Sequence, residues 1–274
     1  MTTTLLRVHR AAAAVWIALV LALTVWTLWL NQLTADSTRA AQTHCAQDYC
    51  DTFPSPYASG AGVIALLTGY GFLLVAAYAG GALIGRELES GTAHLAWTQG
   101  ITPTRWLTAK LALPAATLTA GLTLLVTVFH QGWAANRDLA FDDWYTPALF
   151  LARGPAAVAY ALCALAVGTL AALLLRRALP ALGASVAVMW LLALTLETYR
   201  ADLWPTKTRT TAHPADLPAH AWELAGGRNA HGYYVVFHPE SHYWPLQLVE
   251  CGIVLALAAT ATAASFTLLR RRTA

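Results

Sequence analysis

Long apolar runs without charged residues dominate the chain and recur six times along its length. The hydrocarbon core of a bilayer is about 30 Å thick, so a helix rising about 1.5 Å per residue needs about 20 apolar residues to cross it. Six runs meet this requirement. They predict transmembrane helices near residues 11–30, 62–84, 111–130, 156–175, 179–196 and 246–269. The predicted fold class is therefore an all-α integral membrane protein, with residues 1–274 forming a single transmembrane domain.

Composition excludes the main soluble classes. Of the 274 residues, 57% are hydrophobic and 11% are charged, whereas soluble proteins carry about 25% charged residues. The net charge of +3 comes without a basic stripe interleaved with aromatic residues, so nucleic acid is not an expected partner. The chain is expected to be surrounded by membrane lipid.

The first apolar run has one alternative reading, because Arg7 and Arg10 precede it as they would precede a secretory signal. The core of a signal peptide has about 7 to 15 residues, whereas this run has 20. A retained transmembrane span is therefore predicted.

The distribution of basic residues predicts which side of the membrane each loop occupies. With the N-terminus in the cytoplasm, the inner segments carry ten Lys and Arg residues against two acidic residues, and the outer segments carry seven against twelve. The inner side then has a net charge of +8 and the outer side −5, as the positive-inside rule expects. Both termini are predicted to be cytoplasmic.

Three outer segments are predicted, at residues 31–61, 131–155 and 197–245. The third, between the fifth and sixth spans, is long and rich in aromatic and apolar residues. Such a segment is too apolar for a disordered linker. It is expected to fold as a small cap or to dip into the membrane interface.

The cysteines divide by predicted compartment. Cys45 and Cys50 lie in the first outer segment, where oxidation is permitted, and a disulfide between them is predicted. Cys163 and Cys251 lie in apolar runs and are expected to be inert small hydrophobic residues.

Histidines in the third outer segment raise the question of a metal site. His238 and His242 are four residues apart, which would place both on one helix face. However, Pro239 lies between them and no further ligand set completes a site. No metal site is predicted.

The sequence lacks the residues that nucleotide hydrolysis would need. A phosphate-binding loop places lysine directly after glycine, but Lys110 follows Ala109 and Lys207 follows Thr206. Catalytic residues and cofactors are therefore not predicted on this chain. Of the carboxylates, only Glu197 and Glu250 approach the spans, at outer ends where solvation at the interface is expected.

The inner connection between the second and third spans carries the most specific pattern. Residues 85–111 read G-R-E-L-E-S-G-T-A-H-L-A-W-T-Q-G-I-T-P-T-R-W-L-T-A-K-L. The pattern E-x-E-x-G-T, then Leu, a Thr-containing turn and Lys-Leu at the next span, resembles permease subunits of ABC-2-type ATP-binding-cassette transporters, especially the actinobacterial group. The matching positions are Glu87, Glu89, Gly91, Thr92, Leu95, Thr98, Lys110 and Leu111. The chain departs from the family at Gly100, where proline is frequent, and at Ala96 and Trp97, where aliphatic residues are frequent.

This resemblance implies that residues 87–98, here named the coupling segment, form a cytoplasmic coupling helix that seats in a groove of a separate ATPase subunit. That partner would bind ATP and Mg²⁺. Glu87 and Glu89 are the expected polar contacts to it, and Leu95 and Trp97 the expected apolar contacts. The remaining expected contact residues are Gly91, Thr92, His94 and Thr98.

The resemblance also implies the assembly. Residues 2–10 are similar to the amphipathic elbow that precedes the first span in this family. Two permease copies, expected as a homodimer, and two ATPase subunits would form an exporter in the bacterial plasma membrane. A lining of Leu, Ala, Val and Thr suits a hydrophobic or amphiphilic cargo.

Two other functions stay open. One is a membrane-embedded enzyme acting on lipid-like substrates, whose nearest carboxylate cluster is Asp138, Asp142 and Asp143, without basic partners around it. The other is a non-transporting immunity or sensor protein whose outer loop binds a ligand.

Overall fold

The computed structural model describes residues 2–44, 55–139, 143–211, 217–229 and 232–273. Within these ranges, six helices are long and apolar enough to cross a membrane. They are Ala11–Ala41, Pro56–Glu89, Pro103–Ala135, Ala156–Leu175, Ala178–Leu203 and Glu240–Arg272. Each contains one of the six predicted runs, so the six-span helical fold is confirmed.

The first two helical spans continue beyond their apolar runs. In the first, α1 (Thr2–Trp29) passes through the π-helical turn η1 (Leu30–Thr34) into α2 (Ala35–His44). The second is built from α3 (Pro56–Tyr70), α4 (Phe72–Ala77), the π-helical η3 (Tyr78–Gly85) and α5 (Arg86–Glu89). The predicted outer loop 31–61 is thus wrong at both ends, because residues 31–44 and 56–61 are helical. Residues 2–10, expected to resemble an elbow, run into the first span within α1.

The remaining helices are joined by short connections. After α6 (Thr92–Thr98), the third span is α7 (Pro103–Ala135), which ends five residues beyond the predicted boundary, near the 3-10 turn η4 (Arg137–Leu139). The short α8 (Pro147–Ala152) precedes the fourth span, α9 (Ala156–Leu175). The fifth span is α10 (Ala178–Tyr199), followed by the 3-10 turn η5 (Arg200–Leu203), and the sixth is α11 (Tyr243–Thr273).

Helix α9 is the centre of the bundle. It contacts α4, η3, α7, α10 and α11. In its most apolar 18-residue stretch 61% of the residues are buried, compared with 17% in the corresponding stretches of the first and third spans. Its small residues permit this close packing. A Cβ added at Gly168 would lie 2.8 Å from the backbone nitrogen of Gly80. Helix α9, which carries no charged residue, is thus surrounded by other helices.

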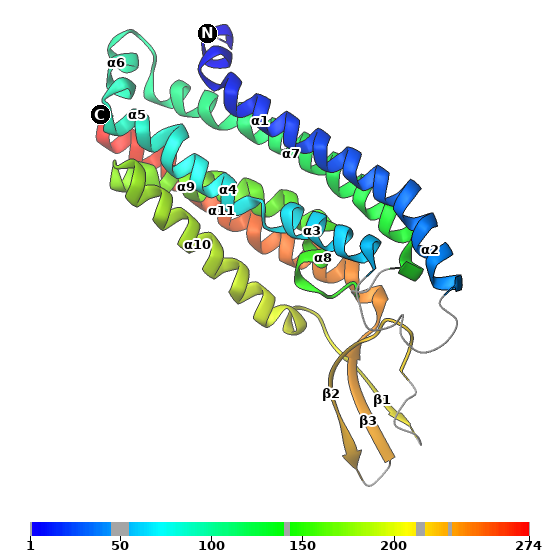
Figure 1. Cartoon of the computed structure of the whole chain (residues 1–274). Helices are drawn as coiled ribbons and strands as arrows, with labels where there is room; N and C mark the ends of the chain where they lie inside the picture. The colour runs from blue at the N-terminus through cyan, green and yellow to red at the C-terminus, as the bar shows by residue number, and fades with distance from the viewer. Residues whose placement is uncertain (1, 45–54, 140–142, 212–216, 230–231, 274) are drawn as a thin grey trace.

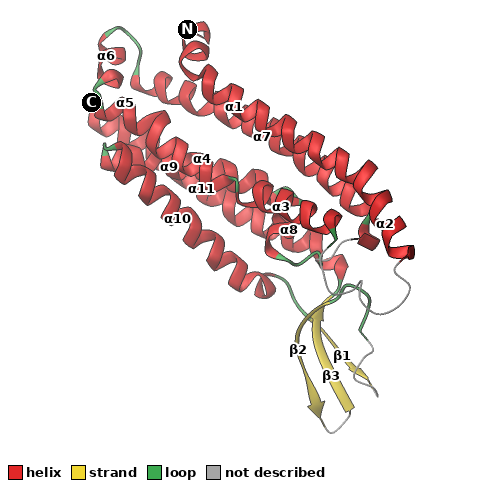
Figure 2. Cartoon of the chain, in the orientation of Figure 1, coloured by secondary structure: helices red, strands yellow, loops and turns green. Residues whose placement is uncertain are grey.

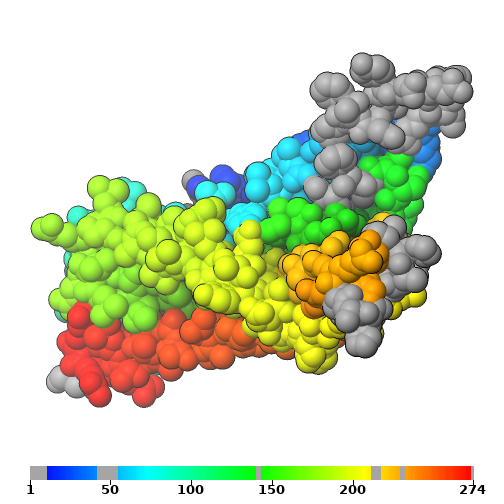
Figure 3. All heavy atoms as spheres, turned by 90° about the horizontal axis from the view of Figure 1, so that it is seen from below, coloured from blue at the N-terminus to red at the C-terminus, as the bar shows by residue number. Residues whose placement is uncertain are grey.

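The helices lie side by side, with α1 against α7 along one side of the bundle (Figure 1). Both termini and α6 lie at one end, which we call the inner end, and the three strands project from the other, the outer end. The termini and the coupling segment thus share one end of the bundle, as expected if all of them lie on one side of the membrane. Seen from the side of the sheet, the α10 surface runs along the molecule from the inner end to the strands (Figure 3).

The third outer segment contains a sheet that projects beyond the ends of the helices (Figure 2). Its strands are β1 (Lys207–Thr211), β2 (Trp222–Asn229) and β3 (Gly232–His238), with β3 in the centre of an antiparallel β1-β3-β2 order. The aromatic and β-branched residues of β3 favour strand formation. The sequence predicted either a small cap or a segment dipping into the membrane interface, without indicating its strands.

Candidate functional site in the inner connection

Two short helices with glycine turns form the connection between the second and third spans. α5 continues the second span, and α6 follows after Gly91. Gly91 has a φ of +75° and Gly100, just beyond α6, a φ of +86°. Both values lie in the left-handed region, which glycine adopts at little cost. The two turns allow α6 to leave the axis of the second span and to return to α7 (Figure 1).

Glu87 joins the coupling segment to the third span. Its Oε1 forms an ion pair with Lys110, and its Oε2 accepts a hydrogen bond of 3.3 Å from Trp106 Nε1. The Lys110 side chain is 3% exposed and that of Glu87 24%, so the pair lies largely out of water. Both carboxylate oxygens of this predicted ATPase contact therefore have partners within the chain.

Glu89 joins the same segment to the fifth span. Its Oε2 accepts a hydrogen bond of 2.9 Å from the backbone N–H of Ala178, the first residue of α10. The first N–H groups of a helix have no partner within it, and a carboxylate there also interacts favourably with the helix dipole. Glu89 is exposed, so this carboxylate caps α10 at the protein surface.

Side chains of α6 divide between an inward and an outward face. Trp97 packs edge-on against Trp106 with ring centroids 5.7 Å apart, and its other neighbour, His94, lies at 4.6 Å. Leu95 is 60% exposed. Exposed together with Leu95 are the predicted contact residues Gly91, Thr92, His94 and Thr98. Trp97 thus contacts the third span, whereas Leu95 is available to a partner.

Hydroxyl groups fix the two ends of α6. Thr92 Oγ1 donates to the carbonyl of Glu87 at 3.2 Å and lies 3.0 Å from Ser90 Oγ. Thr98 Oγ1 donates to the carbonyl of Leu95 at 2.9 Å. These local hydrogen bonds make the connection a defined turn of short helices.

Beneath the coupling segment, the inner ends of several helices meet around a small hollow. Residues of α5, α6, α9 and α11 contribute to it. Its lining consists of Leu88, Trp97, Leu173, Arg176, Leu268, Leu269 and Arg272. Arg272 donates a hydrogen bond to the carbonyl of Leu173. The coupling segment therefore rests on the fourth and sixth spans as well.

A buried charged cluster lies near the outer ends of the spans. Arg200 Nε is 2.8 Å from Glu250 Oε2, and Tyr160 donates a hydrogen bond of 3.0 Å to Glu250 Oε1. The side chains of Arg200 and Glu250 are 2% and 0% exposed. The expectation that Glu250 is solvated at the interface is thus wrong, because its ion pair with Arg200 allows burial. Glu197, also expected there, is half-buried and accepts a hydrogen bond of 3.1 Å from Tyr70.

The two histidines four residues apart lie on different elements, His238 at the end of β3 and His242 in η6 (Glu240–His242). Their Nδ1 atoms are 2.8 Å apart, and His238 Nε2 lies 2.9 Å from the carbonyl oxygen of Ala201. Both are buried. Among the described residues, no group of three or more His, Cys, Asp or Glu side chains is placed to hold a metal.

The outer carboxylates considered for an enzyme have basic partners, contrary to the sequence expectation. Asp138 is 2.9 Å from Arg39 Nε, whose hydrogen bond lowers the pKa of that carboxyl. Asp143 lies 3.0 Å from His220 Nδ1. Asp142 lies outside the described residues. Asp138 and Asp143 are thus members of two separate surface pairs.

The cysteine predictions concern two regions. Cys45 and Cys50, the predicted disulfide, lie outside the described residues. Cys163 and Cys251 are free and buried, as expected of small hydrophobic side chains.

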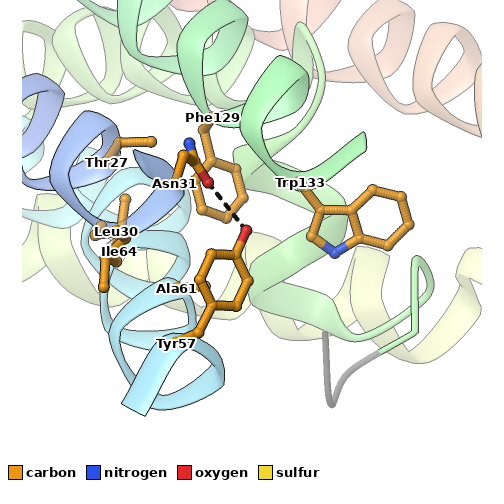
Figure 4. Close-up of a pocket in the computed structure, with 8 residues that line it drawn as sticks. All are labelled: Thr27, Leu30, Asn31, Tyr57, Ala61, Ile64, Phe129 and Trp133. Carbon is orange, nitrogen blue, oxygen red and sulfur yellow. Dashed lines mark hydrogen bonds between the residues drawn. The ribbon is translucent and has the colours of Figure 1, made fainter. Parts of the chain in front are cut away.

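An apolar pocket opens between the first, second and third spans toward their outer ends (Figure 4). Its lining comprises Thr27, Leu30, Asn31, Tyr57, Ala61, Ile64, Phe129 and Trp133. At one end, Tyr57 donates a hydrogen bond of 3.0 Å to Asn31 Oδ1. The pocket thus combines apolar walls with one polar corner.

Comparison with known proteins identifies the family. A family model described as "ABC-2 membrane transporter related" matches residues 11–200, which include the first five spans and the coupling segment. No curated protein and no solved structure matches the chain. The family match covers more than half of the sequence and agrees with the six apolar helices. The chain belongs to the ABC-2 membrane transporter related family.

Proposed function

We propose that this multi-pass permease is half of the membrane part of an ATP-driven exporter, and that a separate ATPase subunit docks on α6. The observation that carries the proposal is the outward face of α6. Leu95 is 60% exposed at the inner end of the bundle, between two left-handed glycine turns and beside exposed polar side chains. In this proposal Leu95 supplies the apolar centre of the docking surface and the exposed polar side chains supply its rim.

The contacts within the chain divide the coupling segment into two roles. Thr92, His94, Leu95 and Thr98 would meet the ATPase, because they are exposed. Glu87 and Trp97 would transmit its movement, because they contact Lys110 and Trp106 of the third span. Glu89 would pass the same movement to the fifth span through the N-terminus of α10.

The working unit would contain two permease copies and two ATPase subunits, with ATP and Mg²⁺ bound by the ATPase alone. Closure of the ATPase pair would displace α6 and alternate access to a pathway between the permeases. The cargo would be hydrophobic or amphiphilic, because the spans consist mainly of Leu, Ala, Val and Thr.

Co-purification tests the docking step. The permease would be expressed with a candidate ATP-binding-cassette ATPase subunit from the same genome, and the complex would be captured in detergent through a tag on the permease. We expect Leu95→Asp to reduce ATPase recovery at least tenfold, since a charge would be buried in an apolar contact. Leu33→Asp is the matched control, because Leu33 is 61% exposed in η1, toward the outer end of the bundle and away from α6. Equal recovery with wild type and Leu95→Asp would refute docking on α6.

A further inference from the structure

Hydrogen-bond donors without partners gather at the outer end of the bundle, near the corner between α8 and α9. Arg153 is 5% exposed, and its guanidinium carbon lies 3.4 Å from the centroid of the Trp133 ring and 4.9 Å from that of Tyr243. Within the described part of the chain, Arg153 Nε and Nη1, Trp133 Nε1 and Tyr243 OH have no hydrogen-bond partner. Buried polar groups are nearly always satisfied, so a group of four calls for an explanation.

A second guanidinium belongs to the same cluster. The Arg137 guanidinium carbon lies 5.0 Å from the Trp133 ring centroid, and Arg137 Nε also lacks a hydrogen-bond partner among the described residues. Its Nη2 is 2.8 Å from Glu240 Oε2, and both side chains are partly exposed, at 30% and 39%. The two arginines and one glutamate give the cluster a net charge of +1, and the cluster reaches the protein surface at the partly exposed side chains of Arg137 and Glu240.

The corner that carries Arg153 is held rigidly. Gln247 of α11 is 0% exposed, and it accepts a hydrogen bond from the backbone N–H of Ala156 at 3.2 Å and donates one to the carbonyl of Phe150 at 2.6 Å. The two bonded residues, Phe150 and Ala156, lie three positions before and three positions after Arg153 in the sequence. His130 Nδ1 lies 3.1 Å from the Arg153 carbonyl oxygen. Such preorganisation lowers the entropic cost of binding a ligand.

The geometry points to an oxyanion site at which Arg153 and Arg137 bind a singly charged phosphate group, carried by a lipid headgroup or by free phosphate. Guanidinium groups and an indole N–H only donate hydrogen bonds, so their ligand must be an acceptor. A planar guanidinium matches two phosphate oxygens at once, and a monoanion balances the net charge of +1. Burial lowers the pKa of Arg153 to about 10, which leaves it charged at neutral pH.

Thermal unfolding of the purified full chain in a non-ionic detergent tests this site, with one arm for each source of phosphate. The first arm adds inorganic phosphate against sodium chloride of equal ionic strength, and the second adds phosphatidylglycerol against phosphatidylcholine. A ligand that binds only the folded state raises its Tm, and we expect a rise of at least about 3 °C near saturation. A rise with phosphatidylglycerol alone assigns the site to a headgroup, and a rise in both arms to the phosphate group itself.

Variants locate the effect. Arg153→Gln should abolish the rise in Tm, and Arg137→Gln should reduce it and provides the test if Arg153→Gln does not fold. Arg228→Gln is the matched control, because Arg228 is an exposed arginine that lies over an aromatic ring, Tyr233, in the sheet. The inference is overturned if neither source raises Tm, if chloride does so equally, or if both variants respond like wild type.

Discussion

The ion pair between Glu87 and Lys110 gives the sharpest test of how the coupling segment is attached. Glu87→Gln removes the carboxylate opposite a lysine that is 3% exposed, and Lys110→Met leaves a carboxylate that is 24% exposed. Removal of one member of a buried pair costs about 3 to 5 kcal/mol. Since Glu87 keeps some contact with water and accepts a hydrogen bond from Trp106, we expect about 2 to 3 kcal/mol for each single variant.

The double variant Glu87→Gln/Lys110→Met removes both charges of the ion pair at once. It should cost less than the sum of the two single variants, with a coupling energy of about 2 kcal/mol. Thermal unfolding followed by tryptophan fluorescence would measure these values, with roughly 2 to 4 °C in Tm for each kcal/mol. Strict additivity of the single effects would show that the pair does not hold the segment to the third span.

Two further predictions concern packing. Glu250→Gln should destabilise the protein by about 3 kcal/mol, because Arg200 is left buried and unpaired; Glu250→Leu combined with Arg200→Met should recover part of that loss, and no recovery in Tm would contradict the account. Gly80→Ala should lower Tm by several degrees, since the added Cβ would lie 2.7 Å from the carbonyl oxygen of Ala181, whereas Gly183→Ala meets nothing within 4 Å and should leave Tm unchanged or higher.

The spans were predictable because hydropathy is a local property of the chain. Each apolar run must lie in a helix to satisfy its backbone in lipid, whatever its neighbours are. The helix extensions beyond residues 30 and 130 were not predictable in this way. They bring together residues far apart in the sequence, such as Arg39 and Asp138, which are 99 positions apart.

The position of the candidate site along the chain could be predicted from the sequence, but the direction in which its side chains point could not. The E-x-E-x-G-T pattern was expected to lie in a single coupling helix over residues 87–98, whereas the left-handed Gly91 divides the segment into α5 and α6. Nothing in the local pattern distinguishes a carboxylate that faces a partner from one that faces the next span. That Glu87 reaches Lys110 follows from the path of the chain through Gly100 and back along α7.

These contacts bear on which parts of the permease would respond to a docked ATPase. The coupling segment is bonded to α7 through Glu87 and to α10 through Glu89. In the most apolar stretches of α7 and its neighbour α1, 17% of the residues are buried. By contrast, α10 packs against the central α9. Just beyond the outer end of α10, Arg200 forms an ion pair with Glu250 of α11. The segment thus bridges a lightly packed pair of helices and a firmly packed group. If an ATPase displaces α6, we expect α1 and α7 to shift against the α9–α10–α11 group, because fewer packing contacts oppose that movement.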